Sequence, residues 1–281
     1  MSTLTRESTP KTRTLLRSNP VLSRLSKIKE RSETNAATYQ GIAVKTTYFL
    51  LITLAGMIAQ LLVKAAMAGE PVWQTIQVYK KFTLTLSMKE AVIVGAVLVV
   101  GFISELLGIF VRKTVPVTGT LYAASQGYVI SFLVFKVLTG YEYLGLEALL
   151  LTVAVVAVMS YLYSSGIVKA DKKFRTVLLS LFLGSIGLGL LSFLGSLIPA
   201  TRPYVQAMLQ NSAFTITMDV LGLLIAALFL ISDFAMIDDC VKQHYPKEFE
   251  WSAAFGLVFT VIWIYLKILD LLMRLADNKN N

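Results

Sequence analysis

Seven long apolar stretches determine what this chain can fold into. They are residues 46–66, 88–111, 117–138, 144–164, 175–198, 216–237 and 250–273. Each is long enough to cross a hydrocarbon core about 30 Å thick. Charged residues make up only 15 % of the chain and lie mostly between these stretches. Spanning segments must satisfy their own backbone groups, and no strand alternation is present, so helices are expected. The sequence therefore predicts an all-α polytopic membrane protein with a bundle of seven transmembrane helices.

The chain divides into a basic tail, a membrane domain and a short end. Residues 1–45 are expected to form a cytoplasmic tail, with a short amphipathic helix near residues 20–31. Such a basic helix can bind anionic lipid headgroups, and a solvated or docked helix without a lipid role is the alternative. The transmembrane domain follows as residues 46–275, and residues 276–281 form a short C-terminal tail.

The distribution of basic residues predicts the orientation of the bundle. Seventeen Lys and Arg residues lie in the tail and in the loops on the same side, and six lie on the opposite side. Basic residues accumulate on the cytoplasmic side, so we expect the N-terminus in the cytoplasm and the C-terminus outside. The protein is then a multi-pass protein of the plasma (inner) membrane. Because the net charge of +9 follows this pattern, no nucleic-acid partner is expected.

Small residues recur four positions apart in three of the stretches. The third has Gly119, Ala123, Gly127 and Ser131, the fifth pairs Ser185 with Gly189 and Ser192 with Ser196, and the seventh has Ser252, Gly256 and Thr260. This spacing lets helix backbones approach closely, and the functional alternative is the lining of a narrow pathway. Packing into one compact bundle is the favoured interpretation.

The residue types needed for catalysis or metal binding are scarce. The chain has one cysteine, Cys240, and one histidine, His244, which lies in a loop. No Ser–His pair is available within the membrane, and no His-rich zinc site can form. We therefore expect neither an enzyme nor a bound cofactor or metal.

Charged residues inside the apolar stretches are the strongest functional signal. An ionised group at mid-bilayer costs about 2.5–3.5 kcal/mol on insertion scales, so each one requires a reason. Glu105 and Asp233 lie in the second and sixth stretches, and Gln126 lies at similar depth in the third. These three could form one polar patch reached from the cytoplasm, able to take up a proton or a cation. The structural alternative is a plain interhelical hydrogen bond.

The seventh stretch adds two more charges, Lys267 and Asp270. Counted along the helices from the turn near residue 245, Lys267 lies roughly 15 Å deeper than Asp233 and nearer the level of Asp219. Asp270 is three positions from Lys267 on the same helix and could pair with the Lys267 charge without any other acid.

Several motifs together resemble the bacterial branch of the Bax inhibitor-1 family, the transmembrane BAX inhibitor motif proteins. They are SNPVLSRL near the start, YAASQG at 122–127, SDFAMID at 232–238 and EWSAAFGLVFTVIWIYLKILDLL at 250–272. The resemblance covers nearly the whole chain. It implies seven helices with the last one central, and in some members a pH-sensitive calcium leak that depends on one acid in each of the last two spans.

Carried over by position, the resemblance gives Asp233 as the acid of the sixth span. The acid of the last span falls at Lys267, and Gln126 stands where relatives often have Glu. A lysine beside Asp233 would form an ion pair and repel a divalent cation. Two pairings thus remain open: Lys267 with Asp233, as the resemblance implies, or with Asp219, as depth suggests.

Two functions follow from these observations. The first is a pH-sensitive cation leak or sensor, for calcium or protons, centred on Asp233. The second is a non-conducting membrane protein that binds other membrane proteins, such as a membrane protease that it modulates. The resemblance implies both, and the missing acids favour the second.

Overall fold

The computed structural model describes residues 35–79 and 81–278, which are mostly helical. Two short strands form the only named sheet in this part of the chain. The predicted amphipathic helix near residues 20–31 lies outside the described residues. The elements are α3 (Tyr39–Ala66), β1 (Gln74–Gln77), β2 (Thr83–Leu86), α4 (Met88–Phe110), η1 (Arg112–Thr114), α5 (Val115–Phe132), η2 (Leu133–Val137), α6 (Tyr143–Ser164), α7 (Lys172–Leu197), α8 (Arg202–Gln210), α9 (Ser212–Lys242) and α10 (Phe249–Asn278).

The described residues contain six helices that are long and apolar enough to cross a membrane: α3, α4, α6, α7, α9 and α10. The prediction of an all-α membrane protein is confirmed, and the count of seven spanning helices is not. The predicted third span is occupied by α5 and η2, which are absent from the six. The α-helix α5 contains polar residues such as Thr118, Ser125 and Gln126 and ends at Phe132, where the π-helical segment η2 begins. A helix enclosed by other helices does not need an apolar surface toward lipid.

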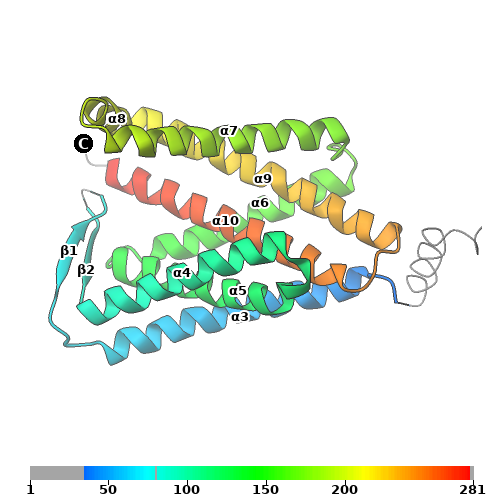
Figure 1. Ribbon diagram of the computed structural model, residues 1–281, viewed down its shortest axis with the longest axis horizontal. Coiled ribbons are helices and arrows are strands. Elements are labelled where there is room, and N and C mark those ends of the chain that lie inside the picture. Colours follow the sequence, from blue (N-terminus) through cyan, green and yellow to red (C-terminus); the bar gives the residue numbers. More distant parts are fainter. Residues whose placement is uncertain (1–34, 80, 279–281) are drawn as a thin grey trace, which may run out of the picture.

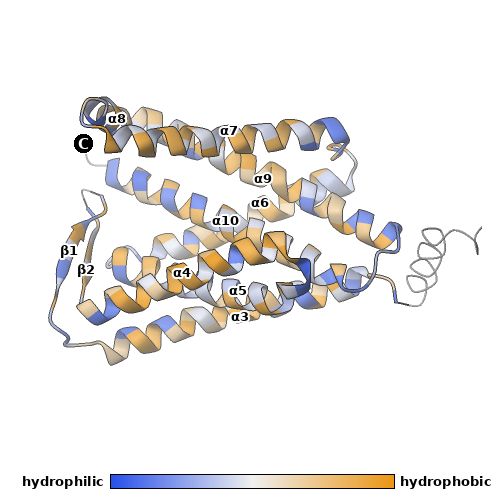
Figure 2. Cartoon of the chain, in the orientation of Figure 1, coloured by the Kyte–Doolittle hydropathy of each residue, from blue (hydrophilic) through white to orange (hydrophobic). Residues whose placement is uncertain are grey.

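The long helices run roughly along one direction, so the bundle has two ends (Figure 1). We call the amino-terminal end the one where α3 begins, which also has η1 and the connections 165–171 and 243–248. The hairpin end has the β1–β2 hairpin, α8 and the last turns of α10. Hydrophilic residues gather near these ends and apolar residues dominate between them (Figure 2), as a bilayer requires.

Side chains at the starts of the helices satisfy backbone groups that have no partner within the helix. The hydroxyl of Thr38 accepts from Gly41 at the start of α3, and Ser87 and Glu90 form a reciprocal capping box at the start of α4. Asp171 and Asn211 cap α7 and α9 in the same way. Caps of this kind typically stabilise a helix by about 1 kcal/mol, and they fix where each helix begins.

The last helix, α10, lies within the bundle and contacts every other long helix. It buries a larger share of its residues than any other of the six apolar helices. Phe255 alone contacts rings of α3 and α5 and lies against Gly108 of α4. Tyr265 donates to a carbonyl of α6, and Trp263 stacks edge-on against Phe182 of α7. The helix also packs along α9, so its position organises the whole bundle.

The small-residue ladder of α5 serves close packing, as the sequence predicts. A Cβ atom at Gly127 would overlap the carbonyl oxygen of Thr53 on α3, and one at Gly56 of α3 would overlap that of Ala124 on α5. Gly119 likewise leaves room for the ring of Phe49. The backbones of α3 and α5 are therefore in contact, which only glycine permits at these positions.

The ladder of α7 differs from this expectation. Cβ atoms at Gly184, Gly187 and Gly189 would meet no atom within 4 Å. Ser185 and Ser192 donate hydrogen bonds to carbonyls of α7 itself. This helix lies at the periphery of the bundle (Figure 1) and buries the least of the six. Spacing alone shows which face of a helix carries small residues. It does not show whether a neighbouring helix packs against that face.

Substituting Gly127 with alanine tests the close approach of α3 and α5. Gly127→Ala is expected to lower the free energy of unfolding by about 1–3 kcal/mol, because the new methyl group forces two backbones apart. Thermal unfolding of the purified protein in detergent measures the change. Gly187→Ala, on the open face of α7, is the matched control and should leave stability unchanged or slightly raised. Equal stability of the two variants would refute the interpretation.

Candidate functional site

Asp233 lies on α9, nine positions before its last residue at the amino-terminal end. Its carboxyl group faces α10. Oδ1 lies 3.7 Å from the position that a Cβ atom at Gly256 would occupy, and the hydroxyl of Thr260 is close enough to interact with the carboxyl group. Oδ2 is buried and has no hydrogen-bond partner among the described residues. The side chain is thus held inside the protein, between α9 and α10, and not among acyl chains.

Lys267 lies far from this carboxyl group. Its Nζ is 3.6 Å from the position of a Cβ atom at Gly222, eleven residues before Asp233 on α9. That separation corresponds to about 16 Å along a helix. Asp219, one turn from Gly222, is close enough to Lys267 for electrostatic attraction. The structure therefore places Lys267 near the level of Asp219, as the residue count suggested, and away from Asp233.

The direct ion-pair partner of Asp219 is Arg274, whose Nε lies 2.6 Å from Oδ2. Arg274 also lies 3.5 Å from Asp270, which accepts a hydrogen bond of 2.5 Å from the hydroxyl of Tyr79. Burial and this hydrogen bond raise the pKa of Tyr79 above its ordinary value. Asp270 is therefore held by Arg274 and Tyr79, and among the described residues no ion pair joins it to Lys267. These five residues form a charge-balanced cluster at the hairpin end.

Glu105 and Gln126 lie on the other side of α10 from Asp233. Glu105 of α4 is near Tyr122 of α5, whose ring packs 5.4 Å from that of Phe255 on α10. Figure 1 shows α10 between α9 and the α4–α5 pair. Within residues 81–278, no hydrogen bond or ion pair connects Glu105 or Gln126 with Asp233. A single patch of all three remains a prediction, and the direct surroundings of Asp233 come from α10 instead.

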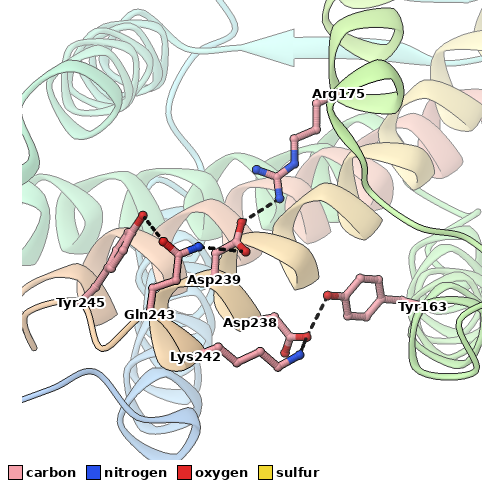
Figure 3. Close-up of polar contacts among 7 residues, drawn as sticks. All are labelled: Tyr163, Arg175, Asp238, Asp239, Lys242, Gln243 and Tyr245. Atoms are coloured by element: carbon pink, nitrogen blue, oxygen red, sulfur yellow. Dashed lines mark hydrogen bonds and ion pairs between the residues drawn. The ribbon is translucent and has the colours of Figure 1, made fainter. Parts of the chain in front are cut away.

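Asp238, five residues beyond Asp233, joins three helices at the amino-terminal end. Its carboxylate accepts hydrogen bonds from Tyr39 of α3 at 2.8 Å and from Tyr163 of α6 at 3.0 Å. Lys242 of α9 pairs with it at 2.6 Å (Figure 3). Two hydroxyl groups and one ammonium group thus hold the last turns of α9 against α3 and α6.

The neighbouring Asp239 points to a different helix. It pairs with Arg175 of α7 at 2.9 Å and receives a long hydrogen bond from Gln243 (Figure 3). An open pocket of about 500 Å³ lies beside these contacts. It is lined by α7, α9 and the α6–α7 connection, and Lys169, Arg175, Asp238 and Asp239 belong to its walls.

Sequence reasoning missed both aspartates because the apolar stretch ends at residue 237, whereas α9 continues to Lys242. The signal was present in MIDDCVK, where two acids precede a lysine at helical spacing.

Glu250, at the start of α10, is the most buried carboxylate in the described residues. Lys45 of α3 forms an ion pair with it, and the backbone and hydroxyl groups of Thr38 donate to its Oε1. A Cβ atom at Gly41 would overlap this carboxylate, so glycine is needed there. The last helix thus anchors the first turn of α3.

No group of three or more His, Cys, Asp or Glu side chains in residues 35–79 and 81–278 is arranged to hold a metal ion. The acids that lie deep in the bundle are instead separate from one another: Asp233 faces hydroxyl and glycine positions, Glu250 has Lys45, and Asp219 has Arg274.

These features define a polytopic membrane protein whose central last helix buries charged and polar side chains. The chain matches the family model described as Bax inhibitor 1 like over residues 19–277. It therefore belongs to this family, as the motifs of the sequence indicated. A comparison with curated protein sequences finds no match.

The buried ion pair at the amino-terminal end generates a stability prediction. Lys45→Met is expected to lower the free energy of unfolding by about 3–5 kcal/mol, because it leaves the Glu250 carboxylate buried without a cation. The double variant Lys45→Met/Glu250→Met should recover part of this loss. Lys89→Met breaks the exposed pair with Glu70 and should cost at most about 1 kcal/mol. Chemical unfolding in detergent measures all three, and equal losses for Lys45→Met and Lys89→Met would contradict the burial argument.

Proposed function

We propose that this protein senses protons or cations at Asp233 and thereby controls a cation leak, of calcium or protons, across the membrane. The observation that carries the proposal is the buried Oδ2 atom of Asp233, which has no hydrogen-bond partner among the described residues. A carboxyl group in an apolar span is costly to insert and is a functional candidate by default. It can bind a proton or a cation only if no fixed cation neutralises it.

The position of Lys267 supports this proposal. A lysine beside Asp233 would neutralise it permanently, whereas Lys267 lies at the level of Gly222 and Asp219. Asp233 is therefore left to exchange its proton. The family resemblance implies a second acid on the last helix, and in this chain Thr260 is the polar group of α10 that faces Asp233.

The proposed orientation places the amino-terminal end in the cytoplasm of a bacterial cell, with the protein in its plasma (inner) membrane. Basic residues of helix ends and connections gather at that end: Arg112, Lys113, Lys169, Lys172, Lys173, Arg175, Lys242 and Lys247. This excess follows the positive-inside tendency and favours contact with anionic headgroups. Asp233 lies in the half of the bundle nearer that side.

Ion flux in reconstituted vesicles tests the role of Asp233. Vesicles with the native protein are expected to show more calcium or proton flux than empty vesicles, with a rate that changes across the neutral pH range. Asp233→Asn should abolish the pH dependence, because an amide does not titrate. Glu147→Gln, which neutralises an exposed acid on α6, is the control. Flux no higher than in empty vesicles, or a pH response that survives Asp233→Asn, would refute the proposal.

A second candidate function is a non-conducting protein that regulates a membrane partner, such as a protease. The open pocket at the amino-terminal end favours it, since Lys169 on its wall offers a positive charge to another protein.

Affinity capture from solubilised membranes tests the second candidate. A regulatory partner should be retained by the native chain and lost on deletion of residues 1–34 or on Lys169→Glu, because both changes remove positive charge from the proposed binding surface. Arg202→Glu, at the hairpin end, is the control for charge reversal. Retention of the partner by both altered chains would exclude this surface.

A further inference from the structure

Three small residues of α10 form a stripe that faces α9. Ser252, Gly256 and Thr260 are four positions apart and therefore lie along one side of the helix. Asp233 is aimed at this stripe, with its carboxyl group near Gly256 and Thr260. Ser252 lies one turn nearer the amino-terminal end, where the loops meet the aqueous phase.

The packing at Gly256 differs from the packing between α3 and α5. At Gly56 and Gly127, a Cβ atom would overlap backbone atoms of the neighbouring helix. At Gly256 its nearest neighbours would be the ends of two side chains, Met236 Cε at 3.4 Å and Asp233 Oδ1 at 3.7 Å. A methyl group therefore fits there, and close backbone contact does not explain this glycine.

Two polar groups along the stripe are buried without a hydrogen-bond partner in the described residues. They are the hydroxyl oxygen of Ser252 and Oδ2 of Asp233, on the two sides of Gly256. Buried polar groups are almost always hydrogen-bonded to protein or water. A stripe that admits water would satisfy both groups, and it leads from the amino-terminal end to the carboxyl group.

Met236 of α9 lies against the middle of the stripe, at Gly256. It lies three residues after Asp233 on α9, and its terminal methyl group covers Gly256. Methionine is unbranched and has three rotatable bonds, so it can leave this position without movement of either helix.

We propose that the stripe of Ser252, Gly256 and Thr260 is the route by which water and small ions reach Asp233 from the amino-terminal end, with Met236 as its gate. This proposal deepens the proposed function and rests on it only for which ion or proton travels along the stripe. Whether water and small ions can reach Asp233 is a separate property that can be measured without ion flux. The route ends at Asp233, at the level of Thr260. Gly256 keeps the route wide because glycine has no side chain.

Cysteine accessibility tests the route without relying on ion flux. Cys240→Ser removes the only native thiol, and Thr260→Cys places a new one beside Asp233. A charged, membrane-impermeant methanethiosulfonate is added from the amino-terminal side of membrane vesicles. Met236→Ala should raise the labelling rate several-fold, because it removes the gate. Gly256→Ala should lower the rate several-fold, because its methyl group narrows the stripe.

Matched controls separate these effects from general loosening of the fold. Met159→Ala shortens a buried methionine on α6, and Gly187→Ala adds a methyl group on the open face of α7. Both should leave the labelling rate of Thr260→Cys unchanged. Met236→Leu keeps the gate filled and should label as slowly as the native side chain. Thermal unfolding shows whether each variant is folded.

The outcomes distinguish this proposal from the proposed function. Labelling that does not respond to Met236→Ala or Gly256→Ala, or that responds equally to the controls, would overturn the route. Labelling that responds as expected in a protein without ion flux would support the route and refute the leak. Flux that depends on Asp233 but not on Met236 would place the ion pathway elsewhere.

Discussion

The packing of α10 against its neighbours is the interaction on which the rest of the structure depends. A bilayer supplies no hydrophobic force between helices, so close contact and hydrogen bonds must hold the bundle together. Phe255, Trp263 and Tyr265 provide these contacts in several directions. Because α10 is enclosed, it can present hydroxyl groups and charges that a lipid-facing helix could not. The candidate site is a consequence of this enclosure.

The charged groups are arranged differently at the two ends of the bundle. At the hairpin end, Arg274 forms ion pairs with Asp219 and Asp270, and Tyr79 donates a hydrogen bond to Asp270. At the amino-terminal end, Asp238 and Glu250 are held by partners from several helices. Asp233 lies between these two layers and has only small and polar neighbours on α10. Asp233 has no cation beside it among the described residues and lies where both ends are fixed, so a local change in its charge need not unfold the bundle.

The hydropathy of the sequence predicted a bundle of membrane helices and an acid within one of them. An acid within an apolar run is costly, so Asp233 was visible from the sequence, whereas the sequence left two levels open for the partner of Lys267. The predicted spans ended where hydropathy falls, and this hid Asp238 and Asp239 on the continuing helix. The ion pair of Lys45 and Glu250 joins positions 205 apart and left no local signal. Small-residue spacing predicted close packing for α5 and for α7, and only α5 shows it, since spacing does not identify a neighbour.

The contact between Thr38 and Glu250 has a consequence for how the protein is assembled. These residues are separated by 212 positions, so the chain segment that begins α3 emerges from the ribosome long before its partner. Until α10 has been inserted, Lys45 and the backbone N–H of Thr38 lack the carboxylate that they bind in the finished bundle. The start of α3 therefore gains its last contacts only when α10 has been translated and inserted. A nascent chain released before that step would have a first helix whose amino-terminal end is not anchored.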